Sequence, residues 1–257
     1  MFVWTAEEEL TRRCMAGEGF VFTPTPPEKL RPYPGAHEYG IAEEVASKVG
    51  YEIQAELTSA EEDPNGAEFT QLDGAGRHAW RLAMFGPDDA AQVSVDVPLI
   101  GTRTEASTEG CLADARSTLY GDVETWIMTE TFTGNFVLAA ATASAADPDL
   151  RALNKEWSDC MGEVGVTPEL ESPDAARGHV RSLYSDVDQS TAHQSELRIA
   201  TADARCETEL DYERRRDRIE DLYLTAAADN HGGHMTAITE IYAQATEAAE
   251  AVLSRQP

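Results

Sequence analysis

Two carboxylates and a cysteine share one face of a single predicted helix. Glu196, Asp203 and Cys206 are separated by seven and three residues, a spacing that aligns side chains along one helix face. Two carboxylates about two turns apart can serve as acid and base, or can hold a cation. The competing interpretation is that they cap neighbouring backbone or pair with arginines around a disulfide, and the lack of an evident third ligand favours it. Glu196 and Asp203 are therefore candidate binding residues.

A histidine pair forms a second candidate site. His231 and His234 flank two glycines, and Asp229 comes just before them. Imidazoles three residues apart beside a carboxylate can share a zinc or copper ion, although the glutamate of an H-E-x-x-H metalloprotease is missing. The competing interpretation is a helix broken by glycines with two exposed histidines. We expect no resident cofactor and keep a divalent metal on these three residues as an alternative.

Motifs of nucleophilic and phosphate chemistry are missing from the sequence. It contains no G-x-S-x-G and no S-x-x-K pattern, which are typical of serine hydrolases and penicillin-binding enzymes. Gly74-Ala75-Gly76 is too short for a phosphate-binding loop and has no lysine after it. No catalytic residue is assigned, and the sequence favours binding over catalysis.

Four cysteines bear on the compartment and the fold. Cys14, Cys111, Cys160 and Cys206 contain no C-x-x-C pair, which disfavours zinc knuckles and thioredoxin-type redox motifs. The simplest interpretation is two disulfides in an oxidising compartment. The alternative is four buried free thiols in a cytosolic protein.

Two of the cysteines lie in segments that resemble each other. Residues 14–19 and 160–165 share the pattern C-M-x-x-x-G, and a Thr-Pro pair follows each at Thr23-Pro24 and Thr167-Pro168. We infer two related halves, each with its own bridge, Cys14–Cys111 and Cys160–Cys206. This pairing is a choice among the three that four cysteines allow. The alternative is a chance recurrence of a short pattern.

The elements that position these residues are predicted to be mainly helical, with one small β-hairpin that includes the valine-rich strand Gln92–Ile100. Thr5 and Glu8 predict a capping box for the first helix, and residues 63–66 predict a turn. We expect an N-terminal half, 1–146, and a C-terminal helical half, 147–257. The predicted helices are Trp4–Gly17, His37–Val49, Glu68–Leu72, Arg77–Phe85, Thr108–Tyr120, Val123–Ala145, Leu150–Val164, Pro173–Tyr184, Ala192–Thr208 and Tyr212–Leu253, the last interrupted at His231-Gly232-Gly233.

Charge excludes two classes of partner. The chain has 257 residues and a formal net charge of −27, so it lacks the basic surface that nucleic acids or anionic membranes would need. No apolar run approaches the roughly 20 residues of a spanning helix, and we expect no transmembrane segment. Three consecutive glutamates within Phe2–Leu10 are unlike a signal peptide. An exported form would therefore be the mature chain after removal of its leader.

Several motifs together resemble a family of uncharacterised exported or lipid-anchored actinobacterial proteins. They are Trp157-Ser158-Asp159-Cys160-Met161-x-x-x-Gly165, Glu196-x-x-Ile199-Ala200-x-x-Asp203-x-x-Cys206, Tyr39-Gly40-Ile41, Gly110-Cys111-Leu112 and Leu119-Tyr120-Gly121. The resemblance implies an extracytoplasmic setting and a helical, disulfide-bonded fold, and it implies no activity. The lipobox cysteine of the lipid-anchored members is missing here.

These observations predict an acidic binding or accessory module of the bacterial cell envelope, located at the cell surface or outside the cell. Its partner is an unknown protein or envelope component. One alternative is a metal-binding protein that uses His231, His234 and nearby carboxylates. Another is a carboxylate-dependent envelope hydrolase whose acids come together only on folding.

Overall fold

The chain divides into two compact units in the computed structural model, which describes residues 2–26, 39–59, 64–99 and 101–255. Unit 1 comprises Met1–Pro34, Glu62–Ala139 and Ala228–Pro257, and unit 2 comprises Gly35–Glu61 and Ala140–Ala227. The sequence predicted the consecutive halves 1–146 and 147–257. The units interleave along the sequence instead, because residues 39–59 pack with the later part of the chain and the last helix packs with the first part.

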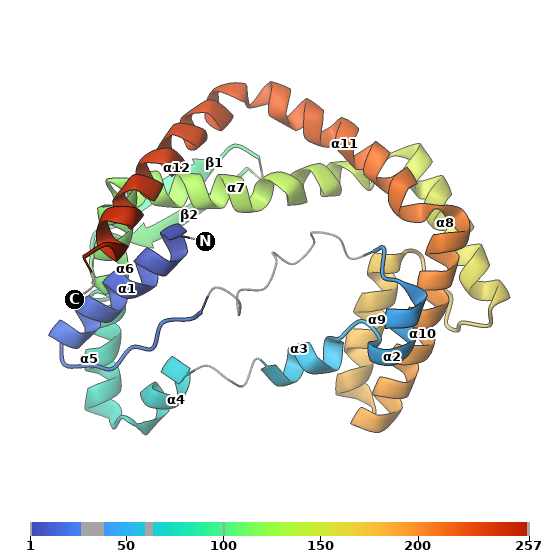
Figure 1. Ribbon diagram of the computed structural model, residues 1–257, viewed down its shortest axis with the longest axis horizontal. Coiled ribbons are helices and arrows are strands. Elements are labelled where there is room, and N and C mark those ends of the chain that lie inside the picture. The colour runs from blue at the N-terminus through green and yellow to red at the C-terminus, as the bar shows by residue number, and fades with distance from the viewer. Residues whose placement is uncertain (1, 27–38, 60–63, 100, 256–257) are drawn as a thin grey trace. The chain divides into compact units, whose positions relative to one another are not determined.

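Unit 1 contains helices packed in a cluster and one hairpin (Figure 1). Helix α1 packs against both α6 and α12, and α5 packs against α6. Strands β1 and β2 pair antiparallel, with Val95 opposite Thr104. The elements are α1 (Phe2–Gly17), α4 (Pro64–Gln71), α5 (Gly74–Phe85), β1 (Gln92–Val97), β2 (Thr102–Ser107), α6 (Cys111–Tyr120), most of α7 (Val123–Ser144), and α12 (Gly232–Leu253).

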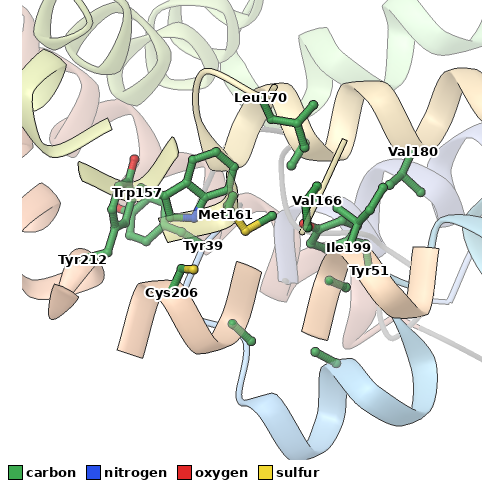
Figure 2. Close-up of a cluster of buried hydrophobic side chains, with 14 of the residues drawn as sticks. Tyr39, Tyr51, Trp157, Met161, Val166, Leu170, Val180, Ile199, Cys206 and Tyr212 are labelled. Carbon is green, nitrogen blue, oxygen red and sulfur yellow. The ribbon is translucent and has the colours of Figure 1, made fainter. Parts of the chain in front are cut away.

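Unit 2 is built around one long helix, α10, which is buried on one face and packs against α2, α8 and α9. Figure 2 shows the core of this unit, with Trp157 near Tyr39 and Tyr212 at one end of the cluster and Val180 at the other. The elements are α2 (Glu43–Val49), α3 (Ile53–Ser59), the end of α7, α8 (Pro148–Glu163), α9 (Pro173–Asp186), α10 (Gln189–Leu210) and most of α11 (Tyr212–Asn230).

The predicted fold class is confirmed: the described residues are mainly helical, with one two-stranded hairpin. The predicted helix break after Asn230 is also present, since α11 ends there and α12 begins at Gly232. Helix α1 begins at Phe2, so the predicted cap at Thr5 is wrong. The turn predicted at 63–66 is replaced by the first turn of α4, which begins at Pro64; proline suits that position because its missing N–H needs no partner there. Asp63, His37 and Glu38 lie outside the described residues.

Both disulfides are present with the predicted pairing. Cys14 and Cys111 join α1 to α6 within unit 1, and Cys160 and Cys206 join α8 to α10 within unit 2. The bridges close segments of 97 and 46 residues. Each unit therefore has one covalent crosslink of its own.

The two copies of the C-M-x-x-x-G pattern end two different helices, α1 and α8, in the same way. In the first copy the N–H of Phe20 bonds the carbonyl of Met15, and in the second the N–H of Val166 bonds the carbonyl of Met161. This six-to-one bond, with a left-handed glycine just before it, defines the Schellman motif. Gly19 and Gly165 supply that conformation with φ of 85° and 81°. The relatedness of two whole halves stays a prediction, because Cys111 begins its helix whereas Cys206 lies inside α10.

Helix length and polarity bear on membrane insertion. None of the helices in the described ranges combines the length and apolar character needed to cross a bilayer.

Candidate functional site

Helix α10 carries three carboxylates on its buried face. Glu196 and Asp203 are fully buried, and Glu207 is 4% exposed. They share this face with Ile199 and Ala200, which contribute to the core of unit 2. Burying carboxylates is costly unless each one gains hydrogen bonds, so their partners decide what this face can do.

Glu196 anchors the start of α3. Its Oε1 accepts hydrogen bonds from the backbone N–H groups of Tyr51 at 3.0 Å and Ile53 at 2.9 Å, and its Oε2 accepts one from the Tyr184 hydroxyl. A Cβ on Gly50 would lie 2.5 Å from the Glu196 Cγ, and Gly50 has a left-handed φ of 66°. This arrangement matches the backbone-capping interpretation of Glu196.

Asp203 joins α10 to α8 and to the connection between α2 and α3. The Tyr51 hydroxyl donates to Oδ2 at 2.7 Å, and the Trp157 indole N–H donates to Oδ1 at 2.8 Å. The Arg177 guanidinium lies 4.4 Å from the centroid of the Tyr51 ring. Burial raises the pKa of Asp203 to about 6, and the two hydrogen bonds offset only part of that shift.

Glu207 is the member of this face that the sequence reasoning missed. Its Oε2 accepts a 2.6 Å hydrogen bond from the Gly40 N–H, while its buried Oε1 has no hydrogen-bond partner among the described residues. Burial, and next the charge of Asp203, raise the pKa of Glu207 to about 8. Its position four residues after Asp203 in a predicted helix was the available signal.

The α10 carboxylates therefore hold the segment from Gly40 to Ile53 against the helix. Four of the six hydrogen bonds described above come from backbone N–H groups of that segment or from the Tyr51 hydroxyl. Asp203 has its two oxygens occupied by Tyr51 and Trp157, and Glu196 also has both oxygens occupied. These hydrogen bonds fit a structural role for the three carboxylates. Glu207 is protonated at neutral pH because its pKa is raised to about 8.

The raised pKa values predict that unit 2 loses stability as the pH rises. An acid whose pKa is higher in the folded state binds its proton more tightly there than in the unfolded state. Its contribution to the free energy of unfolding is complete at a pH below the unfolded-state pKa, and it is lost as the pH rises to the folded-state pKa. The pKa values of Asp203 and Glu207 place this window between about pH 4 and about pH 8. We expect Glu207→Gln to flatten the upper part of the decline in the free energy of unfolding.

The measurement is urea unfolding of unit 2 at a series of pH values. Glu209→Gln is the matched control, because it removes the same charge from the exposed side of α10, where Glu209 pairs with Arg205 at 2.9 Å. If the two variants gave parallel stability curves between pH 6 and pH 9, Glu207 would not be the titrating group.

The histidine pair packs against an aromatic ring in unit 1. His234 stacks on Phe132, with ring centroids 5.5 Å apart, and His231 meets the same ring edge-on at 5.8 Å. His231 directly precedes α12 and Asp229 is exposed near the end of α11. The described part of the chain contains no group of three or more histidine, cysteine or acidic side chains placed to hold a metal.

A groove in unit 1, the β2 groove, was not foreseen from the sequence. It has a volume of about 330 Å³ and is lined by the consecutive strand residues Thr104 to Ser107 and by side chains of α5, α6 and α7. The aromatic lining comes from Phe85, which is 48% exposed, and from half-buried Trp126. Aromatic side chains are enriched in protein interfaces, so this lining suits binding.

Close backbone packing positions the groove. Gly110 precedes α6 with φ of 95°, and a Cβ there would lie 2.4 Å from the backbone nitrogen of Gly86. The lack of a side chain lets the end of α5 approach the start of α6, which places Phe85 beside Leu112 at the groove. Also on α6, Arg116 stacks 3.5 Å over the Trp126 ring and pairs with buried Glu7 at 3.3 Å.

A second, more open groove of about 500 Å³ follows the outer face of α10 in unit 2. Its lining includes Val164, Leu197, Arg198 and Arg205, and contains no aromatic residue. Because this lining offers no aromatic anchor, the β2 groove is the better-defined candidate.

Comparisons with protein-family models, with curated proteins and with solved structures find no match for the chain.

Proposed function

We propose that the chain is an extracytoplasmic binding module of the actinobacterial cell envelope, and that it binds a protein or envelope component in the β2 groove. The observation that carries the binding part is the groove itself, with an exposed aromatic anchor at Phe85 and a rigid wall at Trp126. Exposed apolar side chains that line a concavity are typical of recognition sites.

Two further features support this proposal. One disulfide in each unit is typical of proteins that fold in an oxidising compartment. The α10 carboxylates are the strongest acid–base candidates of the sequence, and their hydrogen bonds to backbone and tyrosine groups fit a structural role. Binding is therefore favoured over a carboxylate-dependent hydrolase.

The proposal predicts that Phe85→Ala weakens binding to isolated actinobacterial cell envelopes about tenfold, because truncating an anchor residue of an interface costs more than about 1 kcal/mol. The measurement is a sedimentation isotherm with the labelled, disulfide-intact chain. Val137→Ala is the matched control, since Val137 of α7 is also 48% exposed and lies outside the groove.

Saturable binding that falls for Phe85→Ala and persists for Val137→Ala supports the proposal. Failure of the unaltered chain to bind saturably, or equal affinities of the two variants, contradicts it.

A further inference from the structure

The β2 groove runs along the free edge of a strand. Four consecutive residues, Thr104 to Ser107, line it, whereas a groove over one face of a strand would meet only every second side chain. No residue of β1 lines it, and β1 occupies the other edge of β2. The lining therefore follows the edge of β2 that faces away from β1.

The register identifies the backbone groups that point into the groove. Thr108 donates its N–H to the carbonyl of Ala91, which makes this pair a hydrogen-bonded one. Hydrogen-bonded and non-hydrogen-bonded pairs alternate in an antiparallel ladder. The pair of Glu105 and Ser94 is three pairs away from that of Thr108 and Ala91, so it is a non-hydrogen-bonded pair. The N–H and C=O of Glu105 and Ser107 therefore point away from β1, and the described residues offer them no backbone partner.

We infer that β2 accepts an extended, lysine- or arginine-containing peptide of a partner protein as a third strand of the sheet. The inference rests on the proposed function, since it names the partner chemistry of the same groove. Strand addition supplies main-chain hydrogen bonds along the edge and side-chain pockets for alternate residues of the peptide.

Side-chain directions give the peptide a definite pattern. Val95 of β1 packs on Ile127 of α7, so its partner Thr104 on β2 also faces the helices, while Glu105 faces solvent and is exposed. A peptide residue directly opposite Glu105 has its side chain on the solvent side, where a cation forms a favourable cross-strand pair. Its neighbours on either side face the pocket between Phe85 and Trp126 and suit apolar side chains.

Charge at the rim favours a basic peptide. Glu105 and Glu109 are exposed at the groove, and the cation Arg116 is already engaged by Glu7 and Trp126. The net charge of −27 adds long-range attraction for a cationic partner. On the same side of β2, Arg103 is paired with Asp96 of β1 at 3.8 Å, so a basic residue opposite Glu105 with apolar residues beside it matches the groove.

The test uses an end-capped synthetic peptide, Lys-Val-Lys-Phe-Lys-Val-Lys, and two N-methylated forms of it. In antiparallel pairing, the lysine N–H groups face β2 and those of the apolar residues face away. N-methylation of the lysines should weaken binding at least tenfold, whereas N-methylation of the apolar residues should leave it nearly unchanged. Amide exchange followed by NMR should show new protection at Glu105 and Ser107.

Two variants of the protein complete the test. Glu105→Pro removes the outward N–H from an edge that tolerates proline, and should raise the Kd for the parent peptide at least tenfold. Glu105→Thr is the matched control: it removes the same charge and keeps the N–H, and it should raise the Kd only about two- to fivefold. The methylated peptides keep the inference testable if the proline variant does not fold.

Loss of binding with one methylated peptide but not the other supports strand addition. Methylation of the lysines abolishes binding if the peptide pairs antiparallel to β2, and methylation of the apolar residues abolishes it if the peptide pairs parallel. Equal binding of all three peptides, or no binding of the parent peptide, overturns the inference. The proposed function is judged separately: envelope binding that survives Glu105→Pro would remove the strand-addition mechanism alone, whereas a chain that binds no envelope component would remove the proposed function.

Discussion

Replacing Glu196 with leucine is expected to lower the free energy of unfolding of unit 2 by about 4 kcal/mol. The substitution leaves the N–H groups of Tyr51 and Ile53, together with the Tyr184 hydroxyl, without their acceptor. Each donor stranded in this way costs about 1–3 kcal/mol. A typical domain has only about 5–15 kcal/mol of stability in total, so the variant should be close to unfolding.

Glu196→Gln is the informative control. Its carbonyl oxygen can still accept from Tyr51 and Ile53, and the tyrosine hydroxyl can rotate to accept from the amide. We expect it to cost about 1 kcal/mol, as for one altered hydrogen bond. Urea unfolding, together with hydrogen exchange over residues 43–59, measures both variants. Equal stability of the leucine and glutamine variants would show that Glu196 does not hold the start of α3.

Gly50 provides an independent approach to the same contact. Alanine there would place its Cβ 2.5 Å from the Glu196 Cγ while adopting a left-handed φ, so we expect exchange to increase over the same residues. Because this change adds atoms and removes no hydrogen-bonding group, agreement with Glu196→Leu would assign the effect to the contact itself.

Removing either disulfide is expected to destabilise its own unit by about 4–5 kcal/mol and to leave the other unit nearly unchanged. The bridges close 97 and 46 residues, and the chain-entropy model gives losses of this size for loops of such length. Cys14 and Cys111 both belong to unit 1, whereas Cys160 and Cys206 both belong to unit 2.

The measurement is peptide-resolved hydrogen exchange of the two double variants, Cys14→Ala with Cys111→Ala and Cys160→Ala with Cys206→Ala. Each variant serves as the control for the other. Increased exchange throughout both units in either variant would contradict the assignment of one crosslink to each unit.

Much of the fold could be predicted because its signals are local. The helix start at Pro173 and the helix break at His231 follow from backbone preferences of single residues. The disulfide pairing followed from the repeated C-M-x-x-x-G pattern, which the structure shows as a shared helix ending. Helix α3 was missed because its first turn is held by Glu196, which lies 143 residues away from Ile53.

The candidate site could be predicted only in part. The spacing of Glu196 and Asp203 correctly placed both on one helix face, but their partners Tyr51 and Trp157 come from other elements. The β2 groove had no sequence signal, because Phe85, Trp126 and the strand edge are brought together by packing across three segments. Spacing within a helix is visible in one sequence, whereas contacts between distant segments are not.

The order of the bridged cysteines has a consequence for the biogenesis of the protein. Each cysteine is joined to the next one along the chain, first to second and third to fourth. A chain emerging from the ribosome or a translocation pore exposes its N-terminal cysteines first. Cys14 and Cys111 can therefore be oxidised before Cys160 appears, and the native pairing then arises in order of emergence. An oxidase acting as the chain emerges would suffice, with no requirement for a disulfide isomerase.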